Sequence, residues 1–526
     1  MNTSSEQIQI YDTTLRDGAQ TYGVSLSVKD RLSIAAKLDE FGIDYIEGGW
    51  PASNPNTTRF FSEVKKLDLP HSRISAFGST RRAGTSMRKD VGAQTLLEAD
   101  TAAVTIFGKS WRLHVKEALR TTLKENLSMI SDTVSFMKDM GREVIYDAEH
   151  FFDGFLDDPE YTVKTLEAAV KGGADMVVLC DTNGGMMPEE LGVIVRKMVK
   201  TLGVPIGIHT HNDSGVAVAN TLEAVRRGAV HVHGTINGIG ERCGNADLCG
   251  VIPNLALKYK RRFNPAVTIK AISQLSYYVA EFTNIPPDSN APFVGHYAFA
   301  HKGGIHVSAV NRNPRCYEHV APQSVGNVRR ILVSEQSGKS NIDFKVKNMG
   351  LKLSRQKKQE ILNMVKEKEI DGLVYEGADA SFEILVQKAI KKHNDYFKLH
   401  GFRIIVENRG DDNVLSEATI KIEVKGEERL AVAEGDGPVN ALDKALRTAL
   451  EPFYPQLKYV HLSDFKVRVI DAKAGTAAKV RVLIESRDNE KEWGTVGISE
   501  NLIEASWMAL TDSIDYKLMK DENSCN

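Results

Sequence analysis

The chain has 526 residues, which is long enough for more than one domain and a large core. Its 67 lysine and arginine residues nearly balance 69 aspartate and glutamate residues, so composition gives no reason to expect a nucleic-acid binder. Five cysteines are odd in number and too sparse for a disulfide framework, which favours a reducing cytoplasm. The N-terminus lacks the features of a signal peptide, and no apolar run approaches the roughly 18 residues of a membrane span. We therefore expect a soluble, cytoplasmic protein with several domains and no membrane segment.

From residue 8 to residue 259, short apolar runs alternate with longer amphipathic runs that are typical of helices. The predicted strands are Ile8–Tyr11, Tyr45–Gly48, Ile74–Phe77, Ala103–Phe107, Val144–Tyr146, Met176–Cys180, Ile206–His211 and Val230–Thr235. Eight strand-then-helix units over about 250 residues match a (β/α)₈ barrel, also called a TIM barrel. An open doubly wound sheet shares this alternation, but no glycine-rich phosphate fingerprint opens a helix after the first strand.

Polar residues follow the predicted strands at one end only. They are Asp12–Gly18 after the first strand, Glu47 at the second, Asp147 and Glu149 at the fifth, Asp181 and Thr182 at the sixth, His209 and His211 at the seventh, and Asn237–Asn245 after the eighth. Because the strands of a barrel are parallel, these ends meet on one face, where barrel enzymes place their active sites.

The pair His209 and His211 is the strongest single signal on that face. Side chains alternate along a strand, so two histidines at a spacing of two point the same way and can bind one cation. Two imidazoles alone do not make a metal site, because a divalent ion with nitrogen and oxygen donors usually needs carboxylate, amide or water ligands as well.

The rest of the chain divides into two further regions. We expect the barrel domain to span 1–285, and several prolines break the following residues into helical connecting subdomains over 286–395. In the region 396–526 a strand-strand-helix pattern occurs twice, which predicts a separate C-terminal α/β domain built from an internal repeat. The first copy includes Ala418–Val424 and Arg429–Ala433, and the second includes Ala478–Glu485 and Glu492–Gly497.

Several motifs together resemble the acyl-CoA-dependent Claisen condensing enzymes, the family that includes 2-isopropylmalate, homocitrate and citramalate synthases. These motifs are Asp12–Gln20, His209–Asp213, Gly234–Asn245 and Gly303–His306, and Gly435–Ala441 is similar to the family's C-terminal regulatory domain. Within the family, Ala19, Gly48–Pro51 and Tyr146–Gly154 are most similar to the long-chain citramalate synthases.

The resemblance implies a metal site that holds a 2-oxo acid. Asp17, His209 and His211 would bind a divalent ion, with Asn245 near the ion directly or through water. Mixed nitrogen and oxygen ligands suit Mg²⁺, Mn²⁺, Co²⁺ or Zn²⁺, and the sequence does not choose among them.

The same resemblance implies roles around the reacting carbonyl. Arg16 would face the developing alkoxide and bind substrate, Thr182 would hydrogen-bond the carboxylate of the oxo acid, and Glu47 would support Arg16 or a metal-bound water.

Acid-base roles fall on acids and histidines further along the chain. Glu149 is the first candidate for the general base or for the group that orients it, and Asp147, two residues away, could take either role. His306 would assist from the connecting region, with His301 as a second candidate.

The implied function is a transferase that condenses acetyl-CoA with pyruvate and water to give (R)-citramalate and CoA in isoleucine biosynthesis. It would be a homodimer whose C-terminal domain binds an amino-acid effector, isoleucine. Three alternatives remain: a 2-isopropylmalate synthase acting on 2-oxoisovalerate, a metal-dependent acyl-CoA lyase, and an inactive barrel that serves as an amino-acid sensor.

Overall fold

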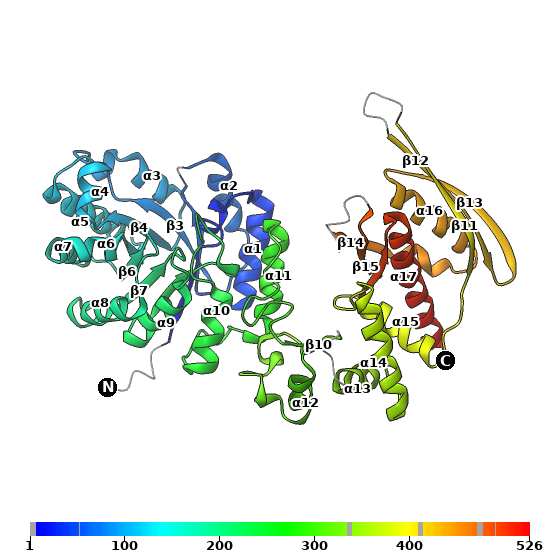
Figure 1. Cartoon of the computed structure of the whole chain (residues 1–526). Helices are drawn as coiled ribbons and strands as arrows, with labels where there is room; N and C mark the ends of the chain where they lie inside the picture. Colours follow the sequence, from blue (N-terminus) through cyan, green and yellow to red (C-terminus); the bar gives the residue numbers. More distant parts are fainter. Residues whose placement is uncertain are drawn as a thin grey trace. The chain divides into compact units, whose positions relative to one another are not determined.

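The computed structural model describes residues 7–51, 53–333, 339–408, 414–470, 477–489 and 491–525 (Figure 1). The chain forms two compact units. The first runs to Phe299 and also includes Val320–Arg329, and the second contains Ala300–His319 and the residues from Arg330 onward. Within the described ranges, no helix is both long and apolar enough to cross a bilayer.

The first unit is a closed barrel of eight parallel strands in sequence order, which confirms the predicted fold. The strands are β1 (Gln9–Asp12), β2 (Tyr45–Gly49), β3 (Arg73–Ser79), β4 (Ala103–Lys109), β5 (Glu143–Glu149), β6 (Met176–Asp181), β7 (Ile206–Thr210) and β8 (His231–Gly234). Strand β8 pairs with β1, with Gln9 opposite His231 and Asp12 opposite Gly234. This pairing closes the barrel.

The helices of this unit lie outside the strands (Figure 1). They are α1 (Val28–Phe41), α2 (Pro55–Val64), α3 (Val91–Glu98), α4 (Arg112–Glu117), α5 (Leu123–Asp139), α6 (Phe151–Asp157), α7 (Pro159–Gly172), α8 (Pro188–Thr201), α9 (Ala217–Arg227), α10 (Leu248–Pro253) and α11 (Ile272–Thr283). Local sequence sets their ends. Helix α1, for example, begins at a capping box of Ser27 and Asp30 and ends at Gly42, which has a left-handed backbone.

Strand side chains are buried on both faces of the barrel wall, which explains why the strands have nearly continuous apolar sequences. One face packs against the surrounding helices. The other fills the barrel, where Tyr11, Tyr45, Ile145 and Val178 belong to one cluster.

The second unit begins with helical segments, as expected for the connecting region. It contains β9 (Ala300–His301), α12 (Gly304–Arg312), β10 (Arg330–Ile331), α13 (Lys339–Asn348), α14 (Arg355–Ile370) and α15 (Asp379–Ala389). Two three-stranded antiparallel sheets follow, each with its own helix.

The predicted internal repeat is present, and each copy has one more strand than the sequence pattern predicted. The first copy is β11 (Lys398–Asn408), β12 (Val414–Val424), β13 (Glu427–Gly435) and α16 (Pro438–Leu450), and the second is β14 (His461–Val469), β15 (Val480–Arg487), β16 (Glu492–Ser499) and α17 (Leu502–Cys525). The extra strands, β11 and β14, are edge strands with mostly exposed side chains. An exposed edge lacks the clear apolar alternation by which a strand is recognised.

The helices of the connecting region share a core with the second repeat copy. Phe382 of α15 and Val365 of α14 lie in one buried cluster with Val496 of β16. The Ser381 hydroxyl donates to Asp512 Oδ2 at 2.6 Å and accepts from the Val496 backbone N–H at 3.0 Å. Helices α14 and α15 therefore fold together with the C-terminal sheets.

Gly497 allows α17 to rest directly on β16, since a Cβ at this position would lie 2.0 Å from the Ala505 carbonyl oxygen. We expect Gly497→Ala to destabilise the second unit by about 1–3 kcal/mol, the usual cost of overpacking. Calorimetry of the full chain measures this as a lower melting temperature. Gly401→Ala in β11 is the matched control, because a Cβ there meets nothing within 4 Å. Equal melting temperatures for the two variants would contradict this account of the α17 contact.

Candidate active site

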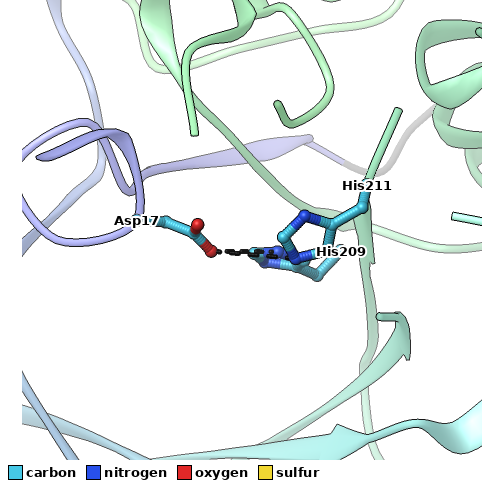
Figure 2. Close-up of side chains that lie close together, drawn as sticks. All are labelled: Asp17, His209 and His211. Atoms are coloured by element: carbon cyan, nitrogen blue, oxygen red, sulfur yellow. Dashed lines mark ion pairs between the residues drawn. The ribbon is translucent and has the colours of Figure 1, made fainter. Parts of the chain in front are cut away.

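Asp17, His209 and His211 converge at the C-terminal end of the barrel (Figure 2). His209 lies in β7 and His211 directly follows it, while Asp17 lies in the loop after β1. Asp17 Oδ2 is 3.5 Å from His209 Nε2 and 3.9 Å from His211 Nε2. The three donor atoms lie within 4.8 Å of one another, and all three residues are buried. One carboxylate and two imidazoles at this spacing could hold a divalent cation.

Asn245 lies beside this group. It forms an isolated bridge with His211, and its amide Nδ2 donates to the Ile239 carbonyl at 3.2 Å. Its Oδ1 atom is buried and has no hydrogen-bond partner among the described residues. A buried acceptor without a partner is costly unless a ligand or water satisfies it. The donor set and this free acceptor therefore fit a divalent cation with a bound water.

The protonation states of these three residues also favour cation binding. Burial lowers the pKa of His209 to about 3, and it lowers the pKa of His211 as well. Burial alone would raise the pKa of Asp17. The positive charge of Arg16, together with the charge that the two histidines carry at low pH, outweighs burial and lowers the Asp17 pKa to about 2. Neutral imidazoles and an ionised carboxylate are the forms that bind metal ions.

The loop after β1 is tied to the loop after β8. Thr14 donates to the buried Asp12 through its backbone N–H and its hydroxyl, both at 2.9 Å, and its hydroxyl oxygen accepts from the Ile236 N–H at 3.0 Å. This contact joins the two strands that close the barrel, and it fixes the segment that carries Arg16 and Asp17.

The Arg16 guanidinium is held on three sides. Its Nε donates to Glu47 Oε2 at 2.6 Å and its Nη1 donates to Asp17 Oδ2 at 3.0 Å, while the group lies 4.0 Å from the centre of the Phe77 ring. Glu47 is fully buried, and its other oxygen accepts from the Tyr11 hydroxyl at 2.9 Å. The structure thus places Glu47 against Arg16, and the guanidinium has a fixed position from which to stabilise negative charge.

A cavity of about 510 Å³ opens beside this group. Predicted site residues line it, namely Arg16, Asp17, Glu149, Thr182, His209 and His211. Part of its wall is aromatic, since Phe77 stacks on Phe107 at 5.1 Å and the Trp50 ring meets Phe107 edge-on at 5.7 Å. Phe77 and Phe107 were not singled out from the sequence, because an aromatic residue at a strand end has the pattern of a core residue.

The two acids of β5 differ in their surroundings. Glu149 is a quarter exposed (25%) and forms an ion pair with Lys109 at the end of β4. Asp147 is buried, and burial together with the charge of Glu47 raises its pKa well above the usual value. Burial therefore favours the neutral form of Asp147, while the less buried Glu149 lines the cavity beside Lys109.

Thr182 follows β6 at the cavity edge. Its hydroxyl oxygen accepts from the His150 backbone N–H at 2.9 Å, and its carbonyl accepts from Arg242 at 2.6 Å. Arg242 also pairs with Asp213 at 2.8 Å. Since the Thr182 hydroxyl already accepts one bond, its own proton is available to donate to a ligand.

The two predicted histidines of the connecting region belong to the second unit. His306 lies on α12, exposed, with its ring stacked on Tyr317 at 4.2 Å. His301 lies in β9, buried, with its Nε2 3.2 Å from Glu318 Oε1. The barrel unit brings together the other predicted site residues.

The sequence pattern did not single out two buried histidines of β8, His231 and His233. His233 Nδ1 lies 3.4 Å from His209 Nδ1. His231 and His233 are two residues apart, the same spacing that identified His209 and His211. This spacing therefore predicts that they too share one face of a strand.

Replacing His209 by Ala removes one of three donors. After metal stripping and reloading with Mn²⁺, we therefore expect the His209→Ala variant to retain no bound Mn²⁺ while remaining folded. Metal content after gel filtration measures the loss, and circular dichroism checks the fold. His71→Ala, at an exposed position away from the donor set, is the control. Retention of Mn²⁺ by His209→Ala at the level of the control would contradict the assignment.

Three family models match consecutive parts of the chain. The HMGL-like family matches residues 7–279, the homocitrate synthase post-HMGL domain-like family matches 293–371, and the LeuA allosteric (dimerisation) domain matches 376–518. Together they cover the barrel, the connecting helices and the repeat.

Curated relatives align over almost the full length. The (R)-citramalate synthase of Aquifex aeolicus is 52% identical over 98% of this chain and 99% of its own length, and that of Geobacter sulfurreducens is 53% identical over 98% of each. The 2-isopropylmalate synthase of Methanocaldococcus jannaschii is 31% identical over 98% of this chain and 96% of its own length. The chain therefore belongs to the HMGL-like family and, within it, to the group of enzymes formed by the (R)-citramalate synthases and their 2-isopropylmalate synthase relatives.

Proposed function

We propose that this chain condenses acetyl-CoA with pyruvate and water to give (R)-citramalate and CoA. The observation that carries the proposal is the fixed Arg16 guanidinium beside the Asp17, His209 and His211 donor set, at one end of a cavity. The identity of more than 50% to two (R)-citramalate synthases supports the choice of substrates.

Asp17, His209 and His211 would hold the divalent ion, with Asn245 in contact directly or through water. A bound Mg²⁺, Mn²⁺, Co²⁺ or Zn²⁺ would polarise the carbonyl of the oxo acid as a Lewis acid. This set of one carboxylate and two imidazoles is compatible with each of these ions.

Residues of the chain supply the remaining chemistry. Glu149 takes a proton from the acetyl methyl group, and the resulting carbon forms a bond to the carbonyl carbon of pyruvate. Arg16 stabilises the alkoxide that develops on the carbonyl oxygen, and Thr182 donates to the pyruvate carboxylate. Water then cleaves the thioester and releases CoA. We also propose that His306 assists the proton transfers.

The cavity wall supports a small oxo acid. The Phe77 and Phe107 rings line the cavity next to the Arg16 guanidinium, and we propose that they limit the space for the alkyl group of a larger substrate such as 2-oxoisovalerate. The intact donor set argues against an inactive sensor. A lyase on the same barrel would leave the LeuA-type domain unexplained.

The match of residues 376–518 to the LeuA allosteric (dimerisation) domain supports a regulatory role for the C-terminal sheets. We propose that the chain functions as a barrel over 1–285, connecting subdomains over 286–395 and a regulatory domain over 396–526. In this proposal the regulatory domain forms a homodimer and binds isoleucine, and the enzyme works in isoleucine biosynthesis in the cytoplasm.

A panel of 2-oxo acids tests the reaction. With acetyl-CoA present, we expect pyruvate to give the highest kcat/KM for the appearance of free thiol, and 2-oxoisovalerate to be a poor substrate. The product should be (R)-citramalate by chiral chromatography. A higher kcat/KM for 2-oxoisovalerate than for pyruvate would establish the isopropylmalate reaction instead.

Amino acids added to the same assay test the regulation. We expect isoleucine to inhibit at lower concentration than leucine or valine, because isoleucine is the product of the proposed pathway. Such an effector acts by binding two states of the enzyme with different affinities. The assay uses the full chain, since α14 and α15 share a core with the regulatory sheets and a cut at residue 396 would expose it. Inhibition by leucine but not by isoleucine would contradict the proposed pathway.

A further inference from the structure

Three imidazoles and one amide form a continuous polar line inside the barrel. His209 Nδ1 lies 3.4 Å from His233 Nδ1, and His233 Nε2 lies 3.0 Å from His231 Nε2. His231 Nδ1 then lies 3.2 Å from Gln9 Oε1 on the neighbouring strand β1. His231 and His233 are fully buried. Apolar side chains would fill this space without loss of hydration, so the line of polar rings calls for a reason.

The order of hydrogen bonds along the line follows from its two ends. A neutral imidazole carries one N–H and one bare nitrogen. His209 Nε2 faces Asp17 and must be bare to bind a cation, so its proton lies on Nδ1 and is donated to His233 Nδ1. His233 then carries its proton on Nε2 and donates to His231 Nε2. His231 in turn donates from Nδ1 to the carbonyl oxygen of Gln9, which can only accept.

The opposite order has a different consequence at the metal site. It would place a proton on His209 Nε2, where it points at Asp17 and blocks the donor atom. The order that ends on the Gln9 carbonyl is therefore the one that leaves His209 ready to bind a cation.

Neighbouring groups hold His233 in this position. The Tyr11 ring stacks on it at 4.0 Å with an angle of 13° between the ring planes. Asp147 Oδ2 lies 3.9 Å from His233 Nδ1, beyond hydrogen-bonding distance, whereas His209 lies within it. His233 Nδ1 is thus directed to the metal-site histidine.

We propose that His233 is a positioning residue for the metal site. It accepts the hydrogen bond from His209 Nδ1 and thereby keeps the bare Nε2 of His209 facing Asp17, and His231 and Gln9 maintain its protonation pattern from the far side of the line. The inference rests on the proposed function, because it requires a cation at Asp17, His209 and His211.

Titration of the metal-stripped full chain with Mn²⁺, followed by electron paramagnetic resonance, tests this role without reference to turnover. We expect His233→Leu to weaken Mn²⁺ binding by about 10- to 100-fold, as is typical when a hydrogen-bond partner of a metal ligand is lost. His233→Gln should bind nearly as tightly as the unaltered chain, because its side-chain oxygen can accept from His209 and its amide can donate to His231. Equal affinities for the unaltered chain and His233→Leu, or equal weakness of the Leu and Gln variants, would overturn the proposal.

The far end of the line gives a second test that does not depend on the folding of His233→Leu. Gln9→Glu keeps an acceptor for His231 and should retain Mn²⁺ affinity, whereas Gln9→Leu should weaken it. Equal affinities for these two variants would overturn the extended line. Failure of the unaltered chain to bind Mn²⁺, or unchanged binding in His209→Ala, would instead refute the proposed metal site itself.

Discussion

The site depends on one run of buried polar contacts that begins inside the barrel and ends at its mouth. Tyr11 donates to Glu47, Glu47 accepts from Arg16, and Arg16 donates to Asp17, whose carboxylate faces the two histidines. Breaking a buried pair by removing one partner leaves an uncompensated charge, which is strongly destabilising. Each group therefore holds the next in place, and the run orients both the guanidinium proposed to meet the substrate and the carboxylate proposed to bind the cation.

Barrel closure brings the parts of this run together. Asp17 lies in the loop after the first strand, while His209 and His211 lie at the end of the seventh, about 190 residues later in a barrel of eight units. The Thr14 contact with Ile236 ties the loops on the two sides of the β1–β8 pair. The hydrogen-bonded line from His209 to Gln9 crosses the same pair, so the donor set is supported by strands that meet only when the barrel is complete.

The alternation of side chains along the strands, and the position of polar residues at the strand ends, made much of the site predictable. Strand alternation predicted that His209 and His211 share a face, and the convergence of parallel strand ends predicted that they meet Asp12–Gly18 and Asn237–Asn245. The resemblance to the family then selected Asp17 and Asn245 for the metal and Arg16 for the substrate. Other features depend on packing that periodicity does not describe. The pairing of Lys109 with Glu149 needs the register of β4 against β5, and the aromatic wall needs the orientation of the Phe77 and Phe107 rings. Strands β11 and β14 are edges whose exposure removes the apolar alternation.

The most direct test of the central claim is the location of the cation. Crystals of the full chain grown with Mn²⁺ and pyruvate, measured at a wavelength where manganese scatters anomalously, reveal each bound ion as a peak. We expect a peak in the barrel unit between Asp17 Oδ2, His209 Nε2 and His211 Nε2, with the pyruvate oxygens completing the coordination beside Arg16. A loaded crystal with manganese elsewhere and none at these three atoms would contradict the proposed mechanism.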